Sequence, residues 1–232
     1  IVGVVGNSNA VDILIQGLEK LEYRGYDSAG IYVTDAPDKG CLVKSVGRIA
    51  DLRAKISSDV KGSTGIGHTR WATHGQATED NAHPHTSETG RFVLVHNGVI
   101  ENYLQIKEEY LQGHKFKGQT DTEIAVHLIG KFVDEDGLSV LEALKKSLHI
   151  IQGSYAFALV DSQAPDTIYV AKNKSPLLIG VGEGYNMVCS DAMAMIRETS
   201  QFMEIHDKEL VVLTKDAITV TDYEGNAIER GT

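Results

Sequence analysis

The order of the secondary-structure patterns along the chain is the sequence feature that most constrains its fold. Both ends carry short apolar runs typical of β-strands, and the middle, residues 102–148, carries apolar positions at helical spacing. Strands followed by helices and then by strands again predict sheets packed together with helices outside them. We therefore expect an α+β fold. No internal repeat, low-complexity tract or linker interrupts the sequence, so we expect one domain over residues 1–232.

The expected elements follow from apolar periodicity. Residues 1–5 predict a buried strand, and apolar residues from Val11 to Leu21 recur at the spacing of a helix. The turn-rich segment 35–40 predicts a hairpin between the second and third strands. The remaining expected strands cover 29–34, 42–46, 64–69, 91–96, 155–161, 167–171, 177–181, 186–189, 210–213 and 217–220. The expected central helices cover 102–112, 121–133 and 138–148.

Charge, hydropathy and cysteine content exclude several classes of function. The formal net charge is -10, so the chain lacks the basic surface that a nucleic-acid partner requires. No apolar run approaches the ~18 residues that cross a bilayer, so we expect no membrane partner. Cys41 and Cys189 show neither disulfide-framework nor metal-ligand spacing, so we interpret both as small core residues and expect a reducing, cytoplasmic location.

Two segments combine polar groups that have both an ordinary and a functional interpretation. In residues 21–30, Gly25 is typical of a helix C-cap and Arg24 of a cation near a helix C-terminus, and the segment alone favours this ordinary interpretation. Residues 68–75 hold Arg70, Trp71 and two histidines directly after an expected strand. A fork-shaped guanidinium suits capture of a carboxylate or phosphate, which indicates a binding loop; the alternative is a surface Arg70 beside a core Trp71.

Two further segments are equally ambiguous. Asn97-Gly98 between apolar runs favours, taken alone, a type I′ hairpin turn. Its functional alternative is an oxyanion hole formed by the Asn97 amide and the Gly98 N–H. Residues 119–123 are as compatible with a helix start capped by Thr120 as with a binding segment that uses Asp121.

Five of the nine histidines lie within 29 residues, which raises a metal-hydrolase alternative. They are His68, His74, His83, His85 and His96. A zinc site needs three or four converging ligands, and a lone His-x-His without a nearby acidic motif supports one weakly. We therefore expect no metal.

Taken together, five segments in this order and spacing resemble the class II glutamine amidotransferase family. They are Tyr23-Arg24-Gly25-Tyr26-Asp27-Ser28-Ala29-Gly30, His68-Thr69-Arg70-Trp71-Ala72-Thr73-His74-Gly75, Asn81-Ala82-His83-Pro84-His85, His96-Asn97-Gly98 and Thr120-Asp121-Thr122-Glu123. The first is most similar to the glutaminase domains of glutamine–fructose-6-phosphate aminotransferases. The chain also lacks the long insertion of animal forms, which indicates a bacterial source.

The resemblance implies an N-terminal-nucleophile hydrolase fold, a four-layer αββα sandwich of two stacked antiparallel sheets. It also implies a nucleophilic cysteine two residues ahead of Ile1, in a Cys-Gly pair that this sequence does not contain. In the family the thiolate attacks the amide carbon and the free terminal amine acts as its base, so one residue supplies two functions. We therefore expect the sequence as it stands to be inactive.

The same resemblance implies an amino-acid pocket. Arg70 would bind the α-carboxylate of glutamine, helped by Thr73 and the backbone around His74. Asp121 and the carbonyl of Gly98 would bind the α-ammonium group.

The resemblance assigns the reaction itself to a second set of residues. Asn97 and the N–H of Gly98 would stabilise the tetrahedral oxyanion, and Arg24 would position the nucleophile. Trp71 would gate the passage of ammonia. The product after a γ-glutamyl thioester would be glutamate, and no cofactor is implied.

The partners implied are L-glutamine or L-glutamate and a C-terminal isomerase domain of the same polypeptide, in a full-length homodimer. That domain would use the ammonia to convert fructose 6-phosphate to glucosamine 6-phosphate in amino-sugar (hexosamine) biosynthesis. Because the sequence ends at Thr232, we expect a glutaminase domain of a longer protein. Two alternatives stay open: a glutamine-binding module without turnover, and a glutaminase domain that feeds another acceptor.

Overall fold

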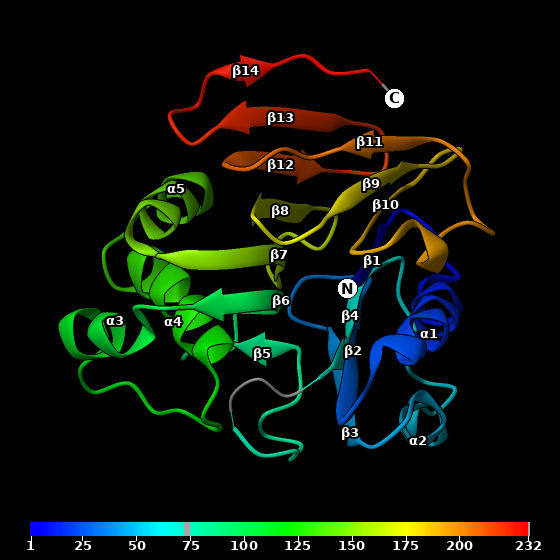
Figure 1. Ribbon diagram of the computed structural model, residues 1–232, viewed down its shortest axis with the longest axis horizontal. Helices are drawn as coiled ribbons and strands as arrows, with labels where there is room; N and C mark the ends of the chain where they lie inside the picture. Colours follow the sequence, from blue (N-terminus) through cyan, green and yellow to red (C-terminus); the bar gives the residue numbers. More distant parts are fainter. Residues whose placement is uncertain (72–74, 232) are drawn as a thin grey trace.

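Two antiparallel sheets lie face to face between two layers of helices in the computed structural model, which describes residues 1–71 and 75–231 (Figure 1). The helices of the middle of the chain cover the outer face of one sheet, and those near the N-terminus cover the other. This arrangement confirms the expected αββα sandwich.

The first sheet carries the N-terminal strand near its centre. Its strands are β1 (Val2–Val5), β2 (Ser28–Thr34), β3 (Cys41–Val46), β4 (Thr64–Arg70), β9 (Leu178–Val181), β10 (Asn186–Cys189) and β11 (Phe202–Glu204). They run in the order β11-β9-β10-β1-β4-β2-β3. Strand β1 therefore lies between β10 and β4, with Val2 opposite Cys189 on one side and Gly67 on the other.

The second sheet pairs the strand that follows the histidine-rich segment with strands from the C-terminal half. Its strands are β5 (His85–Thr86), β6 (Phe92–Ile100), β7 (Gly153–Asp161), β8 (Ile168–Asn173), β12 (Glu209–Leu213), β13 (Ile218–Asp222) and β14 (Ala227–Ile228). They run in the order β14-β13-β12-β8-β7-β6-β5. The longest ladder joins β6 to β7 along their full length.

Five α-helices form the outer layers of the described chain. They are α1 (Ala10–Leu21), α2 (Ile49–Lys55), α3 (Tyr103–Tyr110), α4 (Asp121–Asp134) and α5 (Val140–Ile150). Two short 3-10 turns, η1 (Glu22–Arg24) and η2 (Ala192–Ala194), complete the helical structure. No helix of residues 1–71 and 75–231 is long and apolar enough to cross a membrane.

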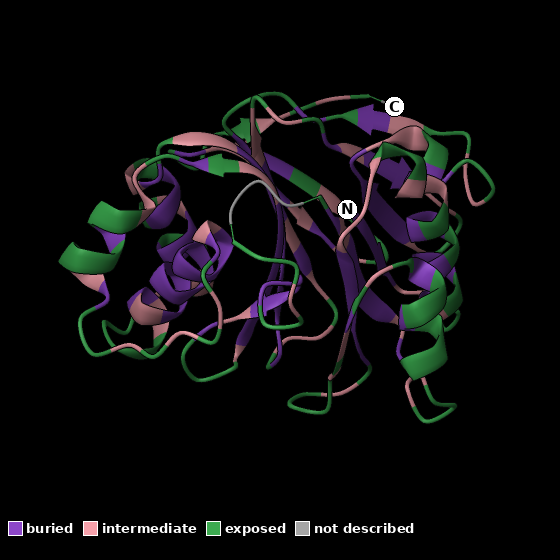
Figure 2. Cartoon of the chain, turned by 60° about the horizontal axis from the view of Figure 1, so that its bottom comes forward, coloured by how far each residue is buried: buried purple, intermediate pink, exposed green. Residues whose placement is uncertain are grey.

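Three apolar clusters hold the layers together. One lies between the sheets and joins Ile66 of β4 to Val95 of β6 and Val170 of β8. The other two lie between each sheet and its helices, with Leu14 of α1 in one and Phe132 of α4 in the other. Figure 2 shows the result: the facing strands are buried and the outer faces of the helices are exposed. The apolar stripe predicted from Val11 to Leu21 is the buried face of α1.

Most expected elements are present, and the exceptions are short or unusual. The hairpin across residues 35–40 is confirmed by the pairing of β2 with β3. The strand expected at 91–96 continues to residue 100. Helix α2 and the short strands β5, β11 and β14 were not expected. Each of these strands has two or three residues, too few to show a period in sequence.

Candidate active site

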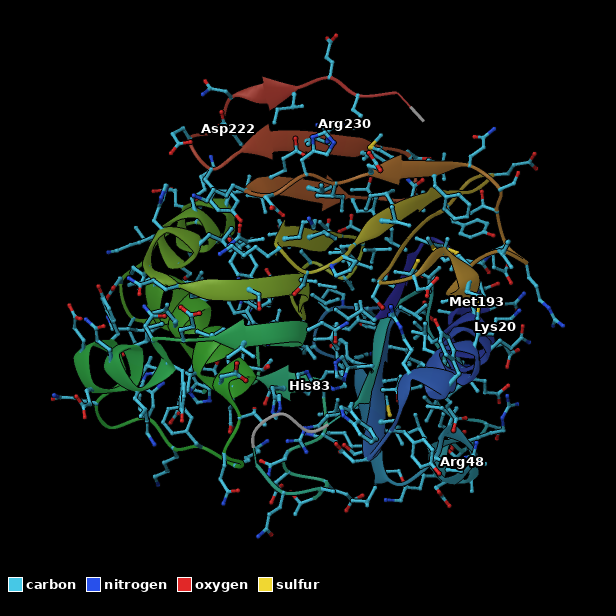
Figure 3. All side chains as sticks on the ribbon, viewed as in Figure 1. Lys20, Arg48, His83, Met193, Asp222 and Arg230 are labelled. Carbon is cyan, nitrogen blue, oxygen red and sulfur yellow. The ribbon has the colours of Figure 1, made fainter. Side chains whose placement is uncertain are left out.

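A cavity of about 270 Å³ opens where the end of β4, the middle of β6 and the start of α4 meet the segment that follows α1. Its lining residues are Leu21, Arg24, Gly25, His68, Thr69, Arg70, Trp71, His83, His96, Asn97, Gly98, Thr120, Asp121 and Thr122. All four ambiguous segments of the sequence therefore contribute to one cavity. Figure 3 labels His83, which lies beside β5 between the two halves of the molecule.

Asn97 and Gly98 lie inside a strand. They belong to β6 and stand opposite Ala156 and Tyr155 of β7, so the hairpin-turn interpretation is wrong. Gly98 has φ +121°, and a Cβ atom there would lie 2.3 Å from the carbonyl oxygen of Ser154. Only glycine fits both this close approach and this backbone conformation.

The orientation of the Asn97 amide is set by His68. The Nε2 atom of His68 lies 2.8 Å from Oδ1 of Asn97, and since that oxygen only accepts, the imidazole donates. Burial holds the pKa of His68 well below its usual value, so the ring is neutral. The ring of His83 stacks on it at 4.0 Å between centroids. With Oδ1 held by His68, the Nδ2 group of Asn97 is left to donate to another acceptor.

The other buried histidines of this region are tied to hydroxyls and backbone. His85 Nε2 lies 2.9 Å from Thr120 Oγ1, and His96 Nδ1 lies 2.8 Å from Thr122 Oγ1. The backbone N–H of His96 donates to His83 Nδ1 at 3.3 Å. Burial lowers the pKa of all three rings. Their nitrogens are not among the convergent metal-ligand atoms found in residues 1–71 and 75–231, so the metal-hydrolase alternative gains no support there.

Arg70 is buried and Trp71 is exposed, the reverse of the ordinary interpretation of this pair. Arg70 is 4% exposed, while Trp71 is 66% exposed. The guanidinium donates from Nη1 to Asp27 Oδ1 at 3.3 Å and to the carbonyl of Gln76 at 2.9 Å. It also donates from Nη2 to the carbonyl of Gly75 at 3.3 Å. A buried cation fixed in this way at a cavity wall is suited to binding an anionic group.

The segment after α1 forms the rim of the cavity. Arg24 ends η1, and its Nη2 atom lies 3.9 Å from Oδ2 of Asp191. Gly25 follows with φ +113°, and a Cβ atom there would lie 2.4 Å from the ring of Trp71. The Trp71 ring therefore packs against the backbone of Gly25, and both residues line the cavity. Gly25 does end a helical turn, which confirms the ordinary interpretation of this segment, and Arg24 lines the cavity as well.

The start of α4 is a capped helix end that also lines the cavity. Thr120 is the N-cap and accepts a hydrogen bond from the N–H of Glu123 at 3.3 Å, which confirms the capped helix start. Asp121, the first residue of α4, lines the cavity. Its Oδ2 atom accepts a hydrogen bond from the N–H of Ile100 at 2.8 Å. This bond ties the end of β6 to α4 and fixes the carboxylate beside Gly98.

Two of the expected binding residues, Thr73 and His74, lie outside the described residues. Sequence reasoning gave no role to several groups that line the cavity, above all His68 and Thr69. Both carry a buried polar atom, Nδ1 and Oγ1 respectively, with no hydrogen-bond partner among the described residues. Such atoms are rare in protein interiors and suit a cavity that binds a polar ligand. Their position at the end of an apolar expected strand was the available sequence signal.

The N-terminal end of β1 points toward this cavity. Val2 pairs with Gly67 on β4, and the Ile1 nitrogen donates to Ser190 Oγ at 2.9 Å. Burial lowers the pKa of the Ile1 amine to about 5, and the nearby Arg24 adds to the effect. Cys189 does not line the cavity: burial raises the pKa of its thiol to about 12, and its Sγ donates to the carbonyl of Asp191.

A sequence model described as a glutamine amidotransferase domain matches residues 43–225, which is most of the chain. The chain belongs to the glutamine amidotransferase family. This confirms the resemblance found in the five segments, and the αββα sandwich is the fold expected of such a domain.

Named relatives and a solved structure agree with this membership. The chain is 83% identical over 230 residues to the glutamine–fructose-6-phosphate aminotransferase (isomerizing) of Streptococcus pyogenes serotype M1 and 82% identical to that of Streptococcus mutans. Each alignment covers 99% of this chain but only 38% of the relative, so the chain spans less than half the length of either enzyme. The glutamine phosphoribosylpyrophosphate amidotransferase from B. subtilis superimposes with a TM-score of 0.83 at 28% identity, over 97% of this chain and 49% of that one.

Proposed function

We propose that this glutamine amidotransferase domain hydrolyses the side-chain amide of L-glutamine to glutamate and ammonia through a γ-glutamyl thioester. The observation that carries the proposal is the cavity itself: a buried guanidinium, a carboxylate and an oriented amide donor face one space of about 270 Å³. These are the groups needed to bind an α-carboxylate, an α-ammonium and a developing oxyanion.

The nucleophile we propose is a cysteine in a Cys-Gly pair ahead of Ile1. In the antiparallel ladder with β4, Val2 stands opposite Gly67, so two more residues in the same register would stand opposite Thr69 and Arg70. Both of these line the cavity. The register therefore supports a thiol at the first of the two added positions reaching the cavity.

Substrate binding would use two charged groups of the cavity lining. Arg70 would hold the α-carboxylate through its guanidinium, while Asp121 and the Gly98 carbonyl would hold the α-ammonium. Thr73 and His74 belong to the same proposal by resemblance alone. Trp71, exposed at the rim on Gly25, would gate the release of ammonia.

At the amide carbon, the first chemical step would form a carbon–sulfur bond and break the carbon–nitrogen bond. The thiolate attacks that carbon, the terminal amine takes the thiol proton, and the carbonyl oxygen becomes an oxyanion. Asn97 Nδ2 and the Gly98 N–H would stabilise it, each contributing on the order of 3 kcal/mol. Collapse expels ammonia, which receives the proton, and water then hydrolyses the thioester to glutamate. Arg24 would position the nucleophile.

We propose further that ammonia passes to a C-terminal isomerase domain that converts fructose 6-phosphate to glucosamine 6-phosphate, in a cytoplasmic homodimer. This rests on the names of the relatives, of whose length the chain spans 38%.

The test compares chains that differ only ahead of Ile1. We expect the chain preceded by Cys-Gly to release ammonia from glutamine, and the chains preceded by Ala-Gly or by nothing to release none. Calorimetry should show that all three bind glutamate. Turnover by the chain that begins at Ile1 would show that the nucleophile is assigned wrongly, and absence of glutamate binding would contradict the assignment of the cavity.

A second candidate function is glutamine or glutamate binding without turnover by the sequence as it stands. It is favoured by one observation: neither Cys41 nor Cys189 lines the cavity. The same three chains distinguish the two functions, because a binding module would retain glutamate affinity and gain no activity from Cys-Gly. A glutaminase domain serving another acceptor would be active with Cys-Gly but would not support glucosamine 6-phosphate formation.

A further inference from the structure

A second cluster of functional groups lies on the helical layer beside α4. His127 is in α4, His114 is in the segment between α3 and α4, and Glu88 is in the turn between β5 and β6. The two imidazole side chains are buried, at 2% and 7% exposed, and the Glu88 side chain is 38% exposed. The cluster shares no residue with the cavity described above.

Three ligand atoms converge in this cluster. The Nδ1 atoms of His114 and His127 lie 2.9 Å apart. Glu88 Oε2 lies 3.8 Å from the first and 3.5 Å from the second. A point equidistant from the three atoms is about 2.0 Å from each of them, and zinc binds imidazole nitrogen and carboxylate oxygen at about 2.0 to 2.2 Å.

A carboxylate lies near the Nε2 atom of each histidine, the nitrogen that points away from the other ligands, as is usual for metal-bound histidines. His114 Nε2 lies 2.7 Å from Glu135 Oε2, and His127 Nε2 lies 3.8 Å from Glu123 Oε2. A carboxylate hydrogen-bonded to the distal nitrogen, as Glu135 is to that of His114, fixes the tautomer that leaves the other nitrogen unprotonated and makes it a better ligand. Glu123 lies beyond hydrogen-bond distance of His127 Nε2 and contributes its negative charge. Both imidazoles therefore turn Nδ1 toward the same point and Nε2 toward an acid.

The remaining contacts hold the ligands in place. The N–H of Lys115 donates to Glu88 Oε2 at 2.9 Å, which orients the carboxylate. The ring of Phe116 packs against that of His127 at 4.5 Å between centroids. Glu123 accepts the N–H groups of Lys117 and Gly118 at 2.8 and 2.9 Å, which ties the segment before α4 to the first turn of that helix.

From this geometry we propose that Glu88, His114 and His127 form a binding site for one divalent transition-metal ion of the zinc type. Two imidazoles and one carboxylate suit zinc, whereas magnesium and calcium prefer oxygen ligands alone. Water completes the coordination on the exposed side of Glu88. The ion joins the β5–β6 turn, the segment before α4 and α4 itself, and so stabilises the domain.

The first experiment uses the 232-residue chain freed of metal by a chelator and titrated with Zn²⁺ alone. We expect calorimetry to show one equivalent bound and the thermal midpoint to rise until one equivalent has been added. Mg²⁺ should leave the midpoint unchanged. Absence of Zn²⁺ binding, or an equal rise with Mg²⁺, would overturn the proposal.

Variants then locate the ion. Glu88→Gln and His114→Gln each remove a ligand outside the apolar core and should weaken Zn²⁺ binding at least about tenfold. Glu135→Gln, which removes a carboxylate behind a ligand, should weaken it by roughly 10- to 100-fold. His149→Gln is the matched control, because His149 is an exposed histidine 3.6 Å from a carboxylate of Glu224.

The comparison also separates a metal site from a purely structural histidine pair. If the two histidines form only a structural pair, the variants should change the thermal midpoint of the metal-free protein. The rise of the midpoint with Zn²⁺ would then be absent in every chain or equal in all of them, and that result would overturn the proposal. The proposal would also be overturned if His149→Gln lost Zn²⁺ binding while Glu88→Gln kept it in full. Co²⁺ offers a second readout: its visible absorption should show nitrogen and oxygen ligation in the parent chain and lose intensity in Glu88→Gln.

Discussion

The substitution Asn97→Asp tests the geometry of the proposed oxyanion hole most directly. His68 Nε2 donates to Asn97 Oδ1 at 2.8 Å, so the amide nitrogen is the group left to face a ligand. An aspartate keeps an acceptor for His68 and replaces the donor with a second negatively charged oxygen. Removal of one such donor costs about 2.7 to 4 kcal/mol, so we expect kcat for glutamine hydrolysis to fall by roughly 10²- to 10³-fold.

Affinity and stability should respond much less. The oxyanion exists only in the transition state, so glutamate affinity should change far less than kcat. The fold should survive because Asn97 is only half-buried and its partner His68 keeps an acceptor.

The assay measures kcat and the thermal midpoint on one preparation of the chain preceded by Cys-Gly. Asn9→Asp, a substitution at an exposed position that adds the same charge, is the control. His68→Phe retains an aromatic ring against His83 but frees the amide to rotate, so it should lower kcat with little change in KM. A near-normal kcat in Asn97→Asp with an unchanged midpoint would refute the oxyanion assignment.

Three further predictions concern stability and binding. Arg70→Lys should weaken glutamate binding more than threefold, as measured by calorimetry, because lysine cannot form the two-bond fork. It should also lower the free energy of unfolding, measured with urea, by about 1.5 to 3 kcal/mol for each charge-assisted hydrogen bond that lysine does not remake, including that to Asp27. Thr120→Ala should cost about 1 kcal/mol through loss of the α4 cap and about 1 to 3 kcal/mol more because the buried His85 Nε2 loses its partner. Urea unfolding measures the loss, and Thr120→Ser should restore stability. In a chain that begins at Ile1, the terminal amine has a pKa of about 5 when folded and about 8 when unfolded, so the unfolded chain binds more protons between these values. The stability of that chain should therefore rise with pH by up to about 4 kcal/mol. Addition of Ala-Gly ahead of Ile1 turns the amine into an amide and should flatten this rise, most visibly between about pH 7 and 8, where unfolded histidines are already mostly neutral.

The sequence predicts the fold well because the fold rests on apolar periodicity. The stripe from Val11 to Leu21 became the buried face of α1, and the apolar runs at both ends became the two facing sheets. It does not predict α2, since only Ile49 and Leu52 of that helix are buried. A helix of seven residues with two buried positions carries too little periodicity to stand out from a loop.

The sequence indicates the candidate site less directly, because contacts between distant segments decide it. Arg70 and Trp71 are neighbours in sequence, yet Arg70 is the buried last residue of β4 and Trp71, the first residue after the strand, is exposed. Periodicity alone did not show where the strand ends. The zinc-type cluster joins residues 88, 114 and 127 from three separate elements. No local spacing marks it. By contrast, the described members of the more conspicuous histidine run, His68, His83, His85 and His96, form a neutral, hydrogen-bonded group.

The misinterpreted Asn97-Gly98 pair shows why local rules fail where a site is built. A type I′ turn needs positive φ at both central residues, but only Gly98 has it among the two. The glycine is required because the carbonyl of Ser154 on β7 approaches its α-carbon, and the asparagine is held by His68 from the other sheet. Neither requirement is visible within a few residues of the pair. The Asn97 amide adds nothing to the apolar core, and the proposed oxyanion hole would account for an oriented donor at this point of β6.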